Sequence, residues 1–209
     1  MRIPIVLAGM EKDVLMLARD LEEKFDVLGY TDVVDRQAPI KYLGHDEDFI
    51  SKSKSSCGIL LPIDTPKIRR KLEKLYRREK FFFPNLISEN AKLGNFTPFN
   101  CEGLIIQSGV YLSLDVKLGN FVKLNVGSKV FHDSIIGEYS TLAPGATVLG
   151  SCKIGMDCYL GSNCTVRNGV SVGDRITIGL GSVVTKSLTS ERGFVYAGNP
   201  ASLLHKEKL

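Results

Sequence analysis

The 209-residue chain contains no tryptophan, only three histidines and only five cysteines. It also lacks any apolar run near the roughly 18 to 20 residues that cross a bilayer, so the sequence predicts no membrane span. Five cysteines without a dense spacing pattern do not indicate a disulfide scaffold, and we therefore expect a cytoplasmic protein. A net charge of +4 does not by itself indicate nucleic-acid binding, and anionic small molecules are equally compatible with it.

A repeat of six residues dominates the second half of the chain. A period of six fits neither the 3.6-residue helix nor the two-residue strand. It fits a coil of three short strands with about 18 residues per turn, in which each aliphatic side chain points to the axis and coils lie about 4.8 Å apart. We therefore expect a parallel β-helix. The aliphatic positions are Ile106, Leu112, Leu118, Leu124, Val130, Ile136, Leu142, Val148, Ile154, Leu160, Val166, Val172, Ile178 and Val184.

Small residues stand two positions before many of these aliphatic residues. Three cysteines at six-residue spacing suggest a metal site, but the C-x2-C signature of zinc sites is missing. Small side chains that fill a packed corner explain the pattern better, so we expect no metal. The small residues are Ser128, Ser134, Ser140, Ala146, Cys152, Cys158, Cys164 and Ser182.

The first part of the chain is predicted to be a Rossmann-like βαβ unit with a parallel sheet. Strand Ile3–Ala8 leads into a helix from about Glu11, and strand Phe25–Tyr30 follows. Cys57–Leu61 is a third apolar run. The turn after the first strand has one glycine, Gly9, where a dinucleotide fingerprint has three. Both a nucleotide-binding and a purely structural role remain open for it.

A second helix is expected after Thr65-Pro66, which offers an N-cap and a proline at the first helical position. Its apolar residues are expected to face the core, and its basic residues to lie on solvated faces. An RNA-binding stripe is the alternative for the basic set. The apolar residues are Ile68, Leu72, Leu75 and Tyr76, and the basic ones are Lys67, Arg69, Arg70, Lys71, Lys74, Arg77, Arg78 and Lys80.

Among the histidines His45, His132 and His205, only His132 lies inside the repeat. It follows the core position Val130 by two residues, so its side chain is expected to point outward. Asp133 is adjacent to it, but neighbouring side chains of a strand point to opposite faces. A contact between the two therefore requires a turn at this position.

The hexapeptide repeat resembles the left-handed β-helix acyltransferases. The preceding βαβ unit narrows this to the bacterial sialic-acid O-acetyltransferase-like sugar acyltransferases, which include N-acetyltransferases of 4-amino-4,6-dideoxy sugar nucleotides. The resemblance covers essentially the whole chain, and the sequence departs from the family at residues 8–11 and at Ser202. The segments that carry it are Gly29-Tyr30-Thr31-Asp32, residues 130–138 (Val-Phe-His-Asp-Ser-Ile-Ile-Gly-Glu) and Ala197-Gly198-Asn199-Pro200-Ala201.

The resemblance implies a catalytic group of three residues. His132 would be the general base that takes a proton from the attacking amine or hydroxyl, which histidine does well near neutral pH. Asp133 would hold the imidazole in the useful tautomer. The N–H of Gly150 would stabilise the oxyanion. Gly150 also lies 18 residues after His132, so coil stacking independently places the two residues next to each other.

The resemblance also implies the ligands. Acetyl-CoA would be the acyl donor in a groove between subunits of a homotrimer, and a nucleotide-linked sugar would bind the first part of the chain. We expect residues 1–82 to form the sugar-nucleotide-binding domain and residues 83–209 the β-helix acyltransferase domain with its tail. The expected acetyl-CoA contacts are Thr141, Ser162, Gly179, Leu180, Gly181 and Lys186, and the expected substrate contacts are Gly9, Met10, Asp32 and Asp64.

The function expected first is an acetyl-CoA-dependent N-acetyltransferase of an amino-sugar nucleotide for bacterial surface glycans. No cysteine is placed as a nucleophile, so the acceptor would attack the thioester directly. Acetylation of a sugar hydroxyl, as on a sialic acid, is the nearest alternative. A β-helix carbonic anhydrase needs three coil histidines and is excluded by having only one. A non-catalytic scaffold subunit is the alternative from another class.

Overall fold

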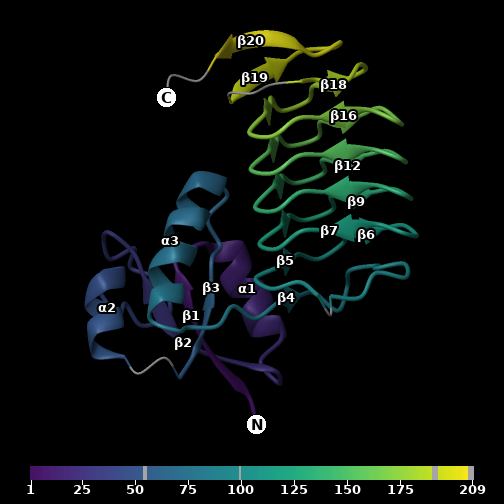
Figure 1. The fold of residues 1–209 in the computed structure, drawn as a ribbon. Coiled ribbons are helices and arrows are strands. Elements are labelled where there is room, and N and C mark those ends of the chain that lie inside the picture. Colours follow the sequence, from purple (N-terminus) through teal and green to yellow (C-terminus); the bar gives the residue numbers. More distant parts are fainter. Residues whose placement is uncertain (54–55, 99, 190–192, 207–209) are drawn as a thin grey trace.

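A computed structural model describes residues 1–53, 56–98, 100–189 and 193–206 (Figure 1). The first part is an α/β unit whose three parallel strands lie in the order β2-β1-β3, as the sequence predicts. A short helix, α2, was not anticipated. The elements are β1 (Ile3–Ala8), α1 (Lys12–Asp20), β2 (Phe25–Thr31), α2 (Asp46–Lys52), β3 (Gly58–Leu60) and α3 (Pro66–Arg78).

The central strand β1 is covered on both faces, which explains its uninterrupted apolar sequence. Ile5 and Leu7 lie in a core cluster with the buried residues of α1. Val6 and Ala8 point the other way, into a cluster with Tyr76 of α3. Strand β1 therefore joins two separate cores.

The second part is a left-handed parallel β-helix, which confirms the fold expected from the repeat. Each strand pairs with the strand 18 residues away, for example Thr147 with Lys129 and Thr165. The strands are β4 (Leu86–Ile87), β5 (Ile105–Ile106), β6 (Tyr111–Leu112), β7 (Lys117–Leu118), β8 (Lys123–Leu124), β9 (Lys129–Val130), β10 (Ile135–Ile136), β11 (Thr141–Leu142), β12 (Thr147–Val148), β13 (Lys153–Ile154), β14 (Tyr159–Leu160), β15 (Thr165–Val166), β16 (Ser171–Val172), β17 (Thr177–Ile178) and β18 (Val183–Val184).

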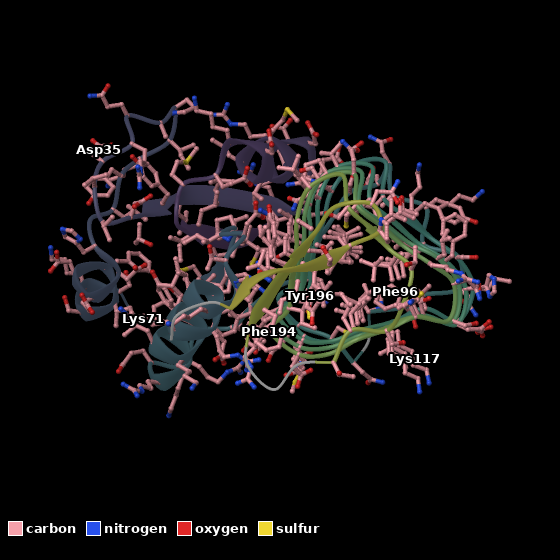
Figure 2. All side chains as sticks on the ribbon, turned by 90° about the horizontal axis from the view of Figure 1, so that it is seen from above. Asp35, Lys71, Phe96, Lys117, Phe194 and Tyr196 are labelled. Carbon is pink, nitrogen blue, oxygen red and sulfur yellow. The ribbon has the colours of Figure 1, made fainter. Side chains whose placement is uncertain are left out.

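Three faces result from this stacking, and Figure 2 shows the coil end-on. The first face contains β4, β5, β8, β11, β14 and β17, and it continues into β19 (Phe194–Ala197) and β20 (Ser202–Lys206). The second face contains β6, β9, β12, β15 and β18. The third face contains β7, β10, β13 and β16.

All fourteen aliphatic residues of the repeat lie in one buried cluster along the axis of the coil. Each such side chain contributes about 1.5 to 3 kcal/mol by its burial. The small residues two positions earlier are buried as well, including Cys152, Cys158 and Cys164. The six-residue pattern thus reports directly which side chains fill the coil.

Helix α3 lies between the sheet and the coil, and this position overturns two expectations for it. Ile68, expected in the core, is 43% exposed, whereas Arg69, expected on a solvated face, is 1% exposed. Thr65 is the N-cap residue, but its side chain makes no capping hydrogen bond. The reason is that α3 packs on two sides, with Leu72 and Tyr76 in the sheet's core and Arg69 facing the coil.

The buried guanidinium of Arg69 fastens α3 to the coil. Nη1 donates to the carbonyls of Ile63 and Asp64 at 2.8 and 3.1 Å and to Thr141 Oγ1 at 2.7 Å. Nη2 donates to the carbonyl of Tyr139. Burial lowers the pKa of Arg69 to about 10, and the nearby Asp64 carboxylate opposes this. Desolvation of the charge is therefore offset by four acceptors.

A second arginine strengthens the same contact. Arg70 forms a bidentate pair with Asp157 at 3.0 and 2.9 Å, and its guanidinium lies 3.9 Å above the ring of Tyr139. The first part of the chain thus contacts the first face and the corner between the third and first faces. The division at residue 82 stays a prediction. Within the described ranges, no helix has the length and apolarity to cross a membrane.

Candidate active site

A tight turn brings His132 and Asp133 together at a corner of the coil. The two residues link β9 to β10, and Asp133 has a φ of +59°. This left-handed conformation breaks the strand alternation, so that Nδ1 of His132 lies 2.8 Å from Oδ2 of Asp133. The carboxylate accepts from Nδ1–H, which leaves Nε2 free to accept a proton. Both side chains are more than half exposed.

Gly150 lies against the imidazole on the next coil. A Cβ at this position would be 2.5 Å from Nε2 and 2.6 Å from Cε1 of His132. The two corners are joined by the hydrogen bond from Ser151 N–H to the carbonyl of His132 at 2.8 Å. Within the described ranges, the Gly150 N–H donates to no acceptor. The free amide and Nε2 therefore belong to one small exposed site.

Two more residues continue this column, here named the His132 corner, which comprises His132, Gly150, Asn168 and Lys186 at intervals of 18 residues. With its amide turned to satisfy both atoms, Asn168 donates to the Gly150 carbonyl at 3.2 Å. Lys186 is exposed three coils from His132, about 14 Å at the usual strand spacing. Its ammonium lies where it can meet an anionic end of a long ligand.

The remaining residues expected to bind acetyl-CoA are not at the His132 corner. Ser162, Leu180 and Gly181 lie at the corner between the first and second faces, here named the Leu180 corner. Gly179 immediately follows β17 at the same corner, and Leu180 is 81% exposed. One chain therefore presents its expected donor-binding residues on two different corners.

Thr141 is placed in neither group, which corrects the expectation that it lines an open groove. Its side chain is fully buried, and its hydroxyl accepts from Arg69 and donates to the carbonyl of Asp64 at 2.9 Å. The outward position on β11 is covered because the first face carries the α/β unit. Thr141 thus joins the two parts of the chain.

The residues expected to contact the acceptor gather at the carboxyl edge of the parallel sheet. Gly9 and Met10 follow β1, and the Met10 N–H donates to Oδ2 of Asp32, which follows β2, at 3.3 Å. Arg36 donates to both oxygens of Asp32 at 3.0 and 3.3 Å. Burial would raise the pKa of Asp32, but the hydrogen bonds from Arg36, Met10 and Val33 outweigh it and lower the pKa below its usual value. The Asp32 carboxylate therefore stays ionised.

Asp64 lies at the same edge and contacts the coil. Its Oδ1 is 2.8 Å from Nζ of Lys123 and accepts from Nδ2 of Asn125 at 3.3 Å. Lys123 is buried, lies 3.6 Å from Glu11 and donates to the carbonyl of Pro62 at 2.6 Å. Sequence reasoning missed Lys123, because an outward lysine of a short strand looks like any solvated lysine until the sheet covers it.

The two groups of candidate residues lie on opposite sides of the coil. The acceptor edge rests on the first face through Lys123 and Asn125. His132 lies at the corner between the second and third faces, which is opposite the first face. Figure 2 shows the α/β elements on one side of the coil, with Lys117 of the third face on the other. A single chain does not bring the acceptor edge to the imidazole.

Comparison with known proteins agrees with this fold. Residues 152–186 match the family described as "Hexapeptide repeat of succinyl-transferase". The chain is a hexapeptide-repeat protein. Among curated relatives of this hexapeptide-repeat protein, the GDP-perosamine N-acetyltransferase of Escherichia coli O157:H7 is 39% identical over 69 residues. That segment spans 33% of this chain and 31% of the relative.

Two solved structures resemble the hexapeptide-repeat protein over nearly its full length. PerB from Caulobacter crescentus, in complex with CoA and GDP-perosamine, aligns with a TM-score of 0.86 at 22% identity and covers 98% of each chain. WeeI from Acinetobacter baumannii AYE aligns with a TM-score of 0.79 at 26% identity, over 98% of this chain and 100% of the other. These similarities extend the agreement in fold to the α/β unit.

Proposed function

We propose that this protein transfers an acetyl group from acetyl-CoA to the amine of an amino-sugar nucleotide. The contact between His132, Asp133 and Gly150 carries this proposal. Its support includes the solved relative that holds CoA and GDP-perosamine and the E. coli relative named for N-acetylation of GDP-perosamine. Both names concern a 4-amino sugar joined to a nucleoside diphosphate, the acceptor class expected from the sequence.

In the proposed step, the amine nitrogen attacks the thioester carbon, and a C–N bond forms. Nε2 of His132 takes the proton that the amine loses, while Asp133 stabilises the imidazolium that results. The carbonyl oxygen gains negative charge and is met by the N–H of Gly150. The tetrahedral intermediate then breaks its C–S bond, and CoA leaves as the thiol after taking a proton.

We propose that the complete site forms between neighbouring chains of a homotrimer. The acceptor edge and the His132 corner lie on opposite sides of one coil, and the Leu180 corner is a third location. A second chain beside the second face can supply the missing groups at each boundary. Exposed apolar side chains at these corners, Leu114 at 57% and Leu180 at 81%, are suitable for such a contact. The five unpaired cysteines favour the cytoplasm as its compartment.

The test uses purified protein, acetyl-CoA and a panel of sugar nucleotides that carry either a free amine or only hydroxyl groups. Free thiol release gives the rate, and mass spectrometry locates the acetyl group. We expect turnover with a 4-amino sugar nucleotide and N-acetylated product. Product acetylated on oxygen would favour the hydroxyl-acceptor alternative, and no turnover with any acceptor would favour a scaffold role.

His132→Ala is expected to lower kcat about 10²- to 10⁴-fold, as loss of a general base does. His45→Ala is the matched control, because His45 is exposed at the start of α2 and makes no side-chain capping bond. Asp133→Asn retains the shape of the residue and tolerates the left-handed φ, so its smaller loss isolates the effect of the charge. Equal rates for His132→Ala and the parent would contradict the base assignment.

A further inference from the structure

The N-terminus of α1 lies at the acceptor edge, where a βαβ unit ordinarily offers free N–H groups and a positive dipole end to a ligand phosphate. In this chain the position is already occupied. Glu11 caps the helix, and its carboxylate accepts from the N–H groups of Asp13 at 3.3 Å and Val14 at 3.1 Å. A carboxylate of the protein thus takes the place that a phosphate would fill.

The space above the first turn is also occupied. Gly9 has a φ of +102°, and a Cβ there would lie 2.8 Å from both Cγ1 and Cδ1 of Ile63. Ile63 comes from the loop after β3 and packs directly on the turn. A glycine turn of this kind binds phosphate when the ligand can approach its backbone closely, and the Ile63 side chain prevents that approach.

The charges at this edge favour the same conclusion. The single ammonium of Lys123 is shared between Glu11 at 3.6 Å and Asp64 at 2.8 Å, and Arg36 is paired with Asp32. These three carboxylates and two cations leave one net negative charge. A pyrophosphate brought to the turn would meet like charge. The Glu11 and Asp64 side chains remain 31% and 46% exposed, so their free oxygens can accept hydrogen bonds.

We propose that Glu11 is a specificity-determining residue that excludes phosphate from the α1 N-terminus. The pyrophosphate of the acceptor then lies away from this helix. The edge instead recognises hydrogen-bond donors of the acceptor, such as base N–H groups or sugar hydroxyls, through Glu11 and Asp64. This inference rests on the proposed function for the identity of the acceptor, but the exclusion of phosphate is testable without it.

The first experiment measures inorganic pyrophosphate binding by calorimetry at fixed ionic strength, with amide NMR to locate it. Glu11→Ser retains a capping oxygen without the charge. Glu23→Ser is the matched control, since Glu23 is exposed beyond the other end of α1. We expect Glu11→Ser to bind pyrophosphate at least tenfold more tightly than both the parent and the control, with the Val14 amide shifted. An equal affinity in all three, or the same Val14 shift in the parent, would overturn the exclusion.

The second experiment measures acetyl transfer by Glu11→Gln, which keeps the size of the side chain but replaces one acceptor oxygen by a donor. We expect KM for the amino-sugar nucleotide to rise at least fivefold while kcat stays within twofold. An unchanged KM would overturn the recognition role. If the parent acetylates no acceptor while Glu11→Ser gains pyrophosphate binding, the proposed function fails and the exclusion stands. If the parent is active and the gain is absent, the reverse holds.

Discussion

At the scale of single residues, the candidate chemistry depends on one turn. Asp133 reaches His132 because its backbone is left-handed, and Gly150 lies against the imidazole because it has no side chain. The identities of all three residues and the 18-residue spacing were visible in the sequence. The contact of Asp133 was not, because alternation along a strand would have separated the two side chains.

Gly150→Ala is expected to lower acetyl transfer at least tenfold, since the new methyl group must displace the His132 ring from its position beside the free amide. Gly150 does not have a positive φ, so the backbone accepts alanine without strain. Steady-state kinetics and the thermal midpoint check this. Ser171→Ala, on the exposed side of β16, is the control. A fully active Gly150→Ala variant would mean that the ring does not act from the observed position.

At the scale of elements, α3 and the coil hold each other. The sequence placed α3 correctly but assigned Arg69 to solvent, because its spacing groups it with the solvated basic residues of the same helix. Only the packing of α3 against the corner at Tyr139 makes this arginine a core residue. Arg69 is thus a structural feature that periodicity does not reveal.

Arg69→Ala is expected to destabilise the fold by about 3 kcal/mol or more, because it removes a buried cation and leaves four acceptors without their donor. Denaturant unfolding followed by circular dichroism measures the change. Lys67→Ala on the exposed side of the same helix is expected to change the free energy of unfolding by less than about 0.5 kcal/mol. Similar values for the two variants would contradict the role of Arg69.

The cysteines inside the coil are expected to be inert. Burial raises the pKa of Cys158 to about 11 and that of Cys164 to about 12. At pH 8 no more than about one Cys158 in a thousand is a thiolate, which is the reactive form. Iodoacetamide at pH 8 should therefore leave both unmodified in the folded protein and label them after denaturation, as read by peptide mass spectrometry. Rapid labelling of Cys158 in the folded state would show that the coil opens.

At the scale of the whole molecule, one chain separates the acceptor edge from the His132 corner. If neighbouring chains complete each site, His132→Ala and Asp32→Ala chains should restore activity when they assemble together. In an equal random mixture, about a quarter of the boundaries would carry both intact halves. Co-expression with two affinity tags and a thiol-release assay measures this. Mixed assemblies no more active than the separate variants would mean that each site lies within one chain.

The sequence by itself determined the coil, its register and the order of the parallel strands. These follow from local rules, since a six-residue aliphatic period and a βαβ pattern each have one way to bury their apolar faces. Tertiary structure alone decided what happens where the two parts meet. Thr141, Lys123 and Arg69 look like surface residues in the sequence, and they become buried because the α/β unit covers the first face. The same covering leaves His132 on the far corner, because a three-sided coil that packs on one face presents its opposite corner to solvent.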